Sequence, residues 1–84
     1  MREKVGKVTH YFSRIGVAVL ELSSDLKVGD SIHILGHTTD FEQVVRSMQI
    51  EHESIQSVGP GDDVALKVVR KVRRGDTVYR IPEE

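Results

Sequence analysis

The sequence predicts an all-β protein built as a closed six-stranded antiparallel β-barrel. Val, Ile and Thr together supply 23 of the 84 residues and Ala only two, a balance typical of strands rather than helices. Apolar residues recur at every second position in several windows, and glycine-centred turns separate these windows. Closure is expected because an open sheet of this length would expose two unpaired edges and one apolar face.

Two windows near the start of the chain predict the first strands. A strand over residues 4–12 breaks its alternation around Gly6, which predicts a β-bulge or a corner at that glycine. Residues 15–20 are apolar on both faces. That pattern is typical of a central strand covered on both sides.

Four later windows alternate between apolar and polar residues, as half-buried strands do. In the second of them Val44 and Met48 share one face, and in the last Val78 shares its face with the charged Arg80. The four windows cover residues 31–35, 43–51, 64–69 and 78–81.

A four-residue cassette of Gly, Asp, a polar residue and a β-branched residue occurs three times, at residues 29–32, 61–64 and 75–78. Glycine is expected to take the positive-φ position of a tight turn, and the Asp carboxylate to accept a hydrogen bond from a nearby backbone N–H. The β-branched residue then begins an inward-facing strand. The cassettes lack the dense acidic loop of a calcium site, so no calcium is expected.

Composition and motifs exclude several classes of protein. Without cysteine there is no disulfide framework and no thiolate metal site. The chain has no apolar run of about 18 residues and no signal-peptide pattern, so we expect a cytoplasmic protein without a membrane partner. It also has no GxxxxGK[ST] motif, so neither nucleotide binding nor hydrolysis is expected.

Candidate catalytic groups are equally sparse. The four histidines have no metal-ligand spacing. Asp62 and Asp63 are neighbours at the start of a strand, so their carboxylates point to opposite faces and cannot share a substrate. The sequence therefore predicts a non-enzymatic protein without a metal or cofactor.

The net charge of −1 conceals an uneven distribution, because residues 1–20 carry +3, residues 21–63 carry −7 and residues 64–84 carry +3. If the two ends of the chain meet, their cations form one basic patch that could face a nucleic-acid backbone. A solvated charged surface without a partner is the alternative. The predicted RNA-binding residues are Lys4, Lys7, Arg14, Lys67, Arg70, Lys71, Arg73 and Arg74.

Three stretches resemble the second domain of translational GTPases such as elongation factor Tu, which is a six-stranded β-barrel. They read LKVGDSIHILG at residues 26–36, VRSMQI at 45–50 and GPGDDVAL at 59–66. The likeness covers residues 4–81. Residues 8–12 and 36–41 add a resemblance to small translation elongation factor-like proteins, and the chain is also similar to the C-terminal barrel of some collagenase-like peptidase family proteins.

In elongation factor Tu this barrel contributes to the pocket for the aminoacylated 3′ end of tRNA. The family positions that hold Glu, His, Arg and Asn correspond here to Gln49, Glu51, His52 and Asp63. None is retained in kind, and two of the replacements are acidic, which would repel a phosphate. The resemblance thus implies the barrel without this mode of tRNA binding.

These observations lead to one expected function and one alternative. The expected function is that of a single domain, residues 1–84, acting as a stand-alone, non-catalytic module that binds RNA or a ribonucleoprotein connected with tRNA or the ribosome. The alternative is a protein-interaction adaptor that supplies the barrel in trans to an RNA-modifying or peptidase-like enzyme, with the acidic residues 40–53 as its contact surface.

Overall fold

The protein is built from β-strands joined by turns, as described for residues 2–82 by a computed structural model. No helix occurs in that range, so the prediction of an all-β protein is confirmed. The strands are β1 (Glu3–Phe12), β2 (Val17–Leu22), β3 (Leu26–Lys27), β4 (Ser31–Leu35), β5 (Asp40–Val44), β6 (Met48–Ile50), β7 (Glu53–Ile55), β8 (Ser57–Val58), β9 (Asp63–Lys67) and β10 (Thr77–Ile81).

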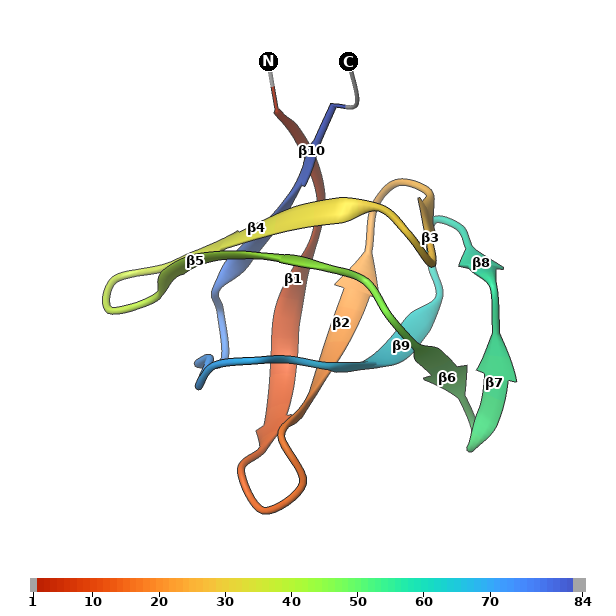
Figure 1. Cartoon of the computed structure of the whole chain (residues 1–84), viewed down its shortest axis with the longest axis horizontal. Helices are drawn as coiled ribbons and strands as arrows, with labels where there is room; N and C mark the ends of the chain where they lie inside the picture. The colour runs from red at the N-terminus through yellow and green to blue at the C-terminus, as the bar shows by residue number, and fades with distance from the viewer. Residues whose placement is uncertain (1, 83–84) are drawn as a thin grey trace.

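Eight of these strands form one antiparallel sheet in the order β5-β4-β10-β1-β2-β9-β6-β7, and β3 and β8 pair in a separate two-stranded sheet. The first and last strands are neighbours, with Glu3 opposite Arg80. The two ends of the chain therefore lie side by side, as Figure 1 shows. The expectation that the basic ends meet is confirmed at the level of the backbone.

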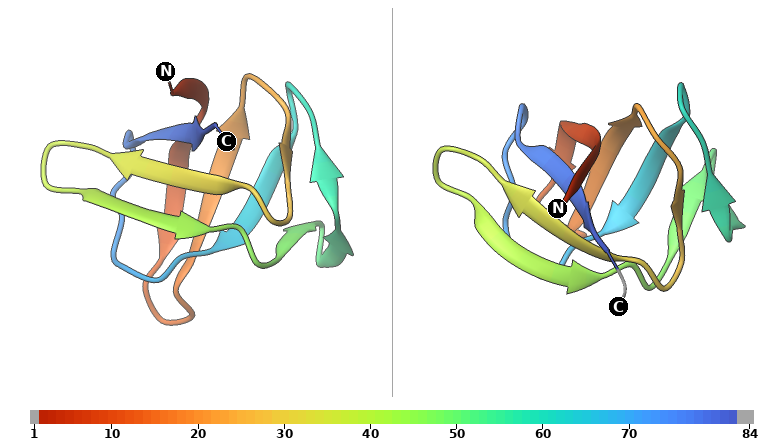
Figure 2. Two further views of the ribbon diagram at one scale, coloured as in Figure 1. Left: turned by 45° about the horizontal axis from the view of Figure 1, so that its top comes forward. Right: turned by 90° about the horizontal axis from the view of Figure 1, so that it is seen from above.

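The expectation of a closed six-stranded barrel is wrong. The large sheet curls around the core (Figure 2), but its end strands β5 and β7 do not pair with each other in residues 2–82. After β5 the chain turns inward, because Val45 N–H donates to the Asp30 carbonyl at 2.8 Å and the Val45 carbonyl accepts from Gly29 N–H at 2.8 Å. These bonds hold Val45 against the turn before β4.

The same turn overturns the prediction of one strand over residues 43–51. The structure divides this window into β5 and β6, with residues 45–47 outside both. Val44, which was expected to face inward with Met48, is 43% exposed, whereas Val45 is 0% exposed. At this point of the chain the odd-numbered Val45, rather than the even-numbered Val44, therefore faces the core.

Gly6 lies at the irregularity that its sequence context predicts. The register of β1 against β10 shifts between Lys4 and Gly6. A Cβ built on Gly6 would stand 2.5 Å from the Glu21 carbonyl oxygen on β2, closer than packed atoms approach. Glycine therefore allows the bulged β1 to lie against its neighbour.

The three Gly-Asp cassettes form the same turn, so this prediction is confirmed. Each glycine has a positive φ, of 100°, 87° and 94° in chain order. In each turn the Asp Oδ2 accepts a hydrogen bond from the backbone N–H three residues earlier, at 2.8–3.0 Å. The bonded pairs are Lys27 with Asp30, Gly59 with Asp62, and Arg73 with Asp76. The β-branched residues that follow, Ile32, Val64 and Val78, are fully buried.

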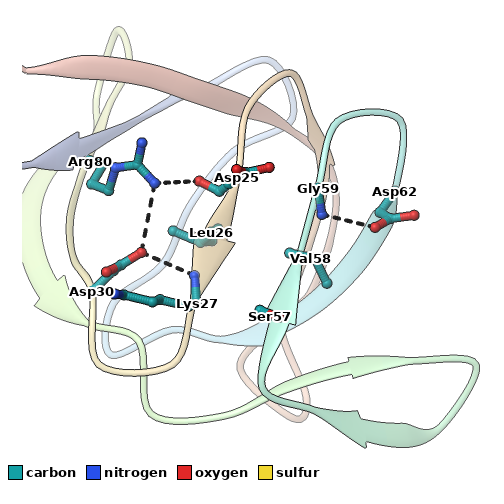
Figure 3. A pocket seen from close by; sticks show the side chains of 9 residues that line it. All are labelled: Asp25, Leu26, Lys27, Asp30, Ser57, Val58, Gly59, Asp62 and Arg80. Carbon is teal, nitrogen blue, oxygen red and sulfur yellow. Dashed lines mark hydrogen bonds and ion pairs between the residues drawn. The ribbon is translucent and has the colours of Figure 1, made fainter.

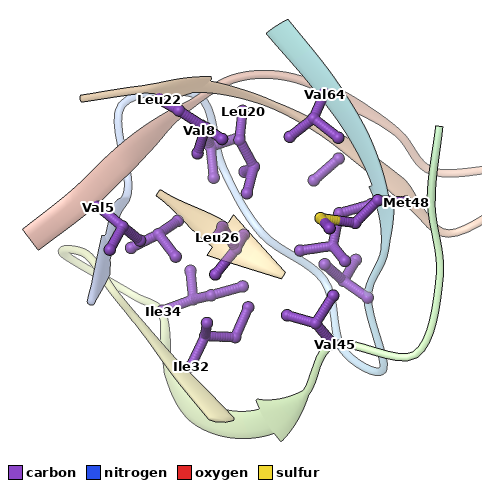
Figure 4. Packing of buried hydrophobic residues seen from close by; sticks show 14 of the residues in the cluster. Val5, Val8, Leu20, Leu22, Leu26, Ile32, Ile34, Val45, Met48 and Val64 are labelled. Atoms are coloured by element: carbon purple, nitrogen blue, oxygen red, sulfur yellow. The ribbon is translucent and has the colours of Figure 1, made fainter. Parts of the chain in front are cut away.

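The core lies inside the curled sheet and takes side chains from both sheets (Figure 4). Burying a Val, Leu or Ile side chain contributes about 1.5–3 kcal/mol. Leu26 of the small β3 reaches this core and is 1% exposed, so the two-stranded sheet covers one end of it. Other members are Val5, Val8, Leu20, Leu22, Ile34, Val45, Met48 and Leu66.

Candidate functional site

The cations predicted from the sequence are all exposed. Lys7 and Arg74 line one hollow of about 300 Å³, and Lys4 and Lys7 line a smaller neighbouring one. Glu21 lines both hollows. The predicted patch therefore contains its own carboxylate at the point where three of its cations gather.

The other five predicted cations do not line these two hollows. Arg70, Lys71 and Arg73 lie with Arg74 on the segment that joins β9 to β10, and Arg14 lies in the β1–β2 turn. Lys67 ends β9 and shares a groove with Arg46.

The four positions taken from the translation-factor pocket are exposed as well. Gln49 on β6 lies opposite Ala65 on β9. Glu51 and His52 form the tip of the β6–β7 hairpin, and Asp63 begins β9. These positions lie at one end of the β9–β6–β7 part of the sheet.

A groove that the sequence did not reveal lies between the small sheet and the end of β10. It measures about 590 Å³, and Figure 3 shows the side chains that line it. The charged and polar members are Asp25, Lys27, Asp30, Ser57, Asp62 and Arg80. Its floor is apolar, with Leu26 and Val58 from the two-stranded sheet.

Arg80 organises this groove. Its Nη1 donates to the Asp25 carbonyl at 2.6 Å and lies 3.9 Å from the Asp30 carboxylate, while Nη2 donates to the Glu3 carboxylate. Glu3 also accepts from Ser24 Oγ at 3.0 Å. The Arg80 guanidinium, followed by the Ser24 hydroxyl, holds the pKa of Glu3 below its ordinary value. One side chain therefore connects β1, the loop after β2 and the turn before β4.

Three charged side chains of this groove, those of Asp30, Asp62 and Arg80, bind the protein itself. Asp30 and Asp62 each accept a backbone N–H within their own turn, and Arg80 is occupied as described. Ser57 has neither an imidazole nor a thiol among the groups that line the groove with it. The arrangement is therefore that of a structural link rather than of a nucleophile with its base.

A second polar cluster surrounds His33 on β4. Arg2 donates to His33 Nδ1 and, at 2.9 Å, to the Glu42 carboxylate, and His33 Nε2 lies 2.6 Å from Asp40 Oδ1. The His33 ring therefore lies between the Arg2 guanidinium and the Asp40 carboxylate. Arg2 is thus paired with a carboxylate and adds no free charge to the basic end of the chain.

Two classes of site were searched across the described part of the chain. No group of three or more His, Cys, Asp or Glu side chains in residues 2–82 is placed to hold a metal ion. In the same residues no helix has the length and apolar character needed to cross a membrane.

Comparison with known proteins relates the chain to one domain of larger proteins. No protein-family model matches it. It is 42% identical over 81 residues to an uncharacterized protease of Methanocaldococcus jannaschii, a match that covers 95% of this chain and 20% of the protease. It is 40% identical over 78 residues to a collagenase of Porphyromonas gingivalis, covering 90% of this chain and 22% of the collagenase. The chain thus spans about a fifth of these relatives.

Two solved structures share the fold. The C-terminal domain of a Geobacillus thermoleovorans protein assigned to the U32 peptidases superposes with a TM-score of 0.89 at 22% identity, covering 95% of this chain and 93% of that domain. The selenomethionine variant of that domain gives a TM-score of 0.87 at 24% identity, with 92% and 98% covered. The chain therefore has the fold of a peptidase C-terminal domain.

These findings correct the functional interpretation of the sequence. The homologues are a protease and collagenases rather than translation elongation factors or RNA-binding proteins, so the prediction of an RNA-binding module of protein biosynthesis is wrong. The likeness to the C-terminal barrel of collagenase-like proteins is the part of the resemblance that holds. The Gly-Asp cassettes misled because they encode a turn into an inward-facing strand, which any β-domain can use.

Proposed function

We propose that this chain is a non-catalytic accessory β-domain of a peptidase-like protein and that it binds the catalytic part of such a protein. The observation that carries the proposal is the extent of the matches. Nearly the whole chain aligns with only a fifth of a protease and of a collagenase. The remainder of those relatives lies outside the matched stretch and leaves ample length for a catalytic unit.

The side chains of the chain fit an accessory role. The Arg80 groove uses its charged groups to join the two ends of the chain to the small sheet, and the described strands share one apolar core. A domain with its own core can bind its catalytic unit either within one polypeptide or in trans. Protein binding is therefore proposed in place of nucleic-acid binding.

Binding in trans is the direct test. The part of the Methanocaldococcus jannaschii protease outside the matched stretch would be purified and titrated with this chain by isothermal calorimetry. We expect a one-to-one complex with a Kd of about 10 μM or tighter. The chain alone should not cleave a fluorogenic peptide. Absence of binding, or peptide cleavage by the isolated chain that survives repurification, would overturn the proposal.

A further inference from the structure

A second groove, here called the seam groove, lies where β5 faces the end of β9. It measures about 410 Å³. Its lining includes Gln43, Val44, Arg46, Lys67, Val68 and Val69. β5 is an end strand of the sheet and shares no ladder with β9 in the described residues, so the groove lies along the unpaired side of β5.

The seam groove exposes apolar surface. Val44 is 43% exposed and Val69 is 66% exposed, and both line the groove. Val68 forms a buried wall at 6% exposure, and its N–H donates to the Gly16 carbonyl at 2.9 Å. Single exposed aliphatic residues are ordinary, but two that line the same groove beside a buried third form a continuous apolar surface of the kind that partners contact.

The walls of the seam groove are fixed before any partner arrives. Gln43 Nε2 donates to the Lys67 carbonyl at 3.0 Å, and Val69 N–H donates to Gln43 Oε1 at 2.9 Å. The side-chain amide thus links β5 to the segment after β9 with the pattern of a backbone peptide group. A preorganised surface loses little conformational entropy on binding.

The charge on the rim selects the kind of partner. Arg46 and Lys67 are exposed at the seam groove, and none of the ion pairs found in residues 2–82 involves either of them. No carboxylate lines this groove. A second copy docking by the same surface would bring these cations against their own counterparts, which is unfavourable. A partner with carboxylates flanking an aliphatic side chain complements both features.

We propose that the seam groove binds an acidic segment of the peptidase-like catalytic unit. An aliphatic side chain of that segment lies between Val44 and Val69, and its carboxylates meet Arg46 and Lys67. This inference rests on the proposed function and adds the surface and the chemistry of the contact.

The test uses two variants and two matched controls in the calorimetric titration described above. Val69→Glu removes the apolar contact, and the pair Arg46→Glu with Lys67→Glu reverses the rim charge. Each is expected to weaken binding at least about tenfold. Leu35→Glu changes an apolar residue that is 39% exposed outside the groove, and Arg70→Glu with Lys71→Glu reverses two exposed cations outside it. Both controls should bind nearly as the unaltered chain does.

The outcomes separate the two proposals. Thermal melts first establish that each variant is folded. If Val69→Glu is unstable, the charge-reversal pair still tests the groove, because it alters only exposed side chains. Binding of the unaltered chain that survives the charge reversal would overturn the seam groove and leave the accessory function standing. No binding by the unaltered chain would overturn both. A dimer in sedimentation that Val69→Glu disrupts would assign the groove to a second copy and would also overturn this inference.

Discussion

Gly36 lies so close to Asp76 that a Cβ built on the glycine would stand 1.9 Å from the Oδ1 atom of that carboxylate. Asp76 is 5% exposed and is held by the N–H of Arg73 at 2.8 Å. Gly36 itself donates to the Thr39 carbonyl at 2.7 Å within the β4–β5 turn. The turn after β4 and the turn before β10 can therefore pack together only when residue 36 has no side chain.

Replacing Gly36 with Ala should destabilise the fold. The added methyl would have to displace a buried carboxylate from its turn, at a cost of about 1–3 kcal/mol in the free energy of unfolding. Urea denaturation followed by circular dichroism would measure the change. Gly59→Ala is the matched control, because its Cβ would stand 3.4 Å from the nearest atom, an Asp25 carboxylate oxygen. Equal stability of the two variants would contradict the close packing at Gly36.

Substitutions at the tip of the β6–β7 hairpin should stabilise the folded protein. Glu51 and His52 have positive φ values of 50° and 68°, as the two central residues of a type I′ turn must. This left-handed conformation costs a residue with a side chain about 1–2 kcal/mol, and Asn-Gly is the preferred pair. Glu51→Asn combined with His52→Gly should therefore raise the free energy of unfolding by about 1–2 kcal/mol in the same assay.

A glycine placed in the neighbouring strand provides the contrast. Ser54→Gly lies within β7, opposite Gln49 of β6, where glycine weakens a strand. It should lower the free energy of unfolding slightly. A double variant at Glu51 and His52 no more stable than Ser54→Gly would show that the positive φ values carry no strain.

The parts of the fold that could be predicted are those set within a few residues. Each Gly-Asp turn is closed by its own Asp and a backbone N–H three positions earlier, so the pattern alone specifies it. The bulge at Gly6 followed from its broken alternation for the same reason. Local chemistry determines these elements, and the sequence displays it.

Where distant contacts decide, the sequence was ambiguous. Val44 and Val45 are equally apolar, and it is Val45, bonded to Gly29 and Asp30 far away in the sequence, that is buried. The role of Arg80 depends on Glu3, 77 residues away. The sequence does show that the charged Arg80 shares a strand face with Val78. The meaning of this pattern becomes clear only once β1 is known to pair with β10.

The pairing of Glu3 with Arg80 should be visible in a pH titration. Because Arg80 and then Ser24 lower the pKa of Glu3 from its ordinary value of 4.5, the folded state favours the carboxylate more than the unfolded state does. The stabilisation is thus present above the unfolded pKa and is lost as pH falls through the lower folded pKa. NMR detection of the Glu3 carboxyl carbon would follow this titration.

Two substitutions test the cause of that shift. Arg80→Met should return the Glu3 midpoint most of the way to the ordinary value, and Ser24→Ala should move it less, since the guanidinium is the larger contributor. A larger effect from Ser24→Ala would contradict the assignment of Arg80 as the principal partner.

The bridge made by Gln43 across the seam should respond to a change of a single atom. In Gln43→Glu one carboxylate oxygen still accepts from Val69 N–H. The second oxygen replaces the Nε2 donor, which in the unaltered chain lies 3.0 Å from the Lys67 carbonyl oxygen, and so faces that carbonyl. The carboxylate oxygen and the Lys67 carbonyl oxygen, both acceptors, would then repel each other in place of a hydrogen bond. We expect a loss of about 0.5–1.5 kcal/mol in the free energy of unfolding, while the Val69 amide, whose hydrogen bond is kept, should exchange nearly as it does in the unaltered chain.

Gln43→Ala removes both bonds and should therefore show faster hydrogen exchange at the Val69 amide. Gln49→Ala is the matched control, because Gln49 is exposed on β6 and has no side-chain hydrogen bond among those found in residues 2–82. If Val69 exchanged at the same rate in all three variants as in the unaltered chain, the amide would not hold the seam. β5 and β9 share no ladder in the described part of the chain. The backbone hydrogen bonds of Val45 would then be the contacts that keep β5 in place near β9.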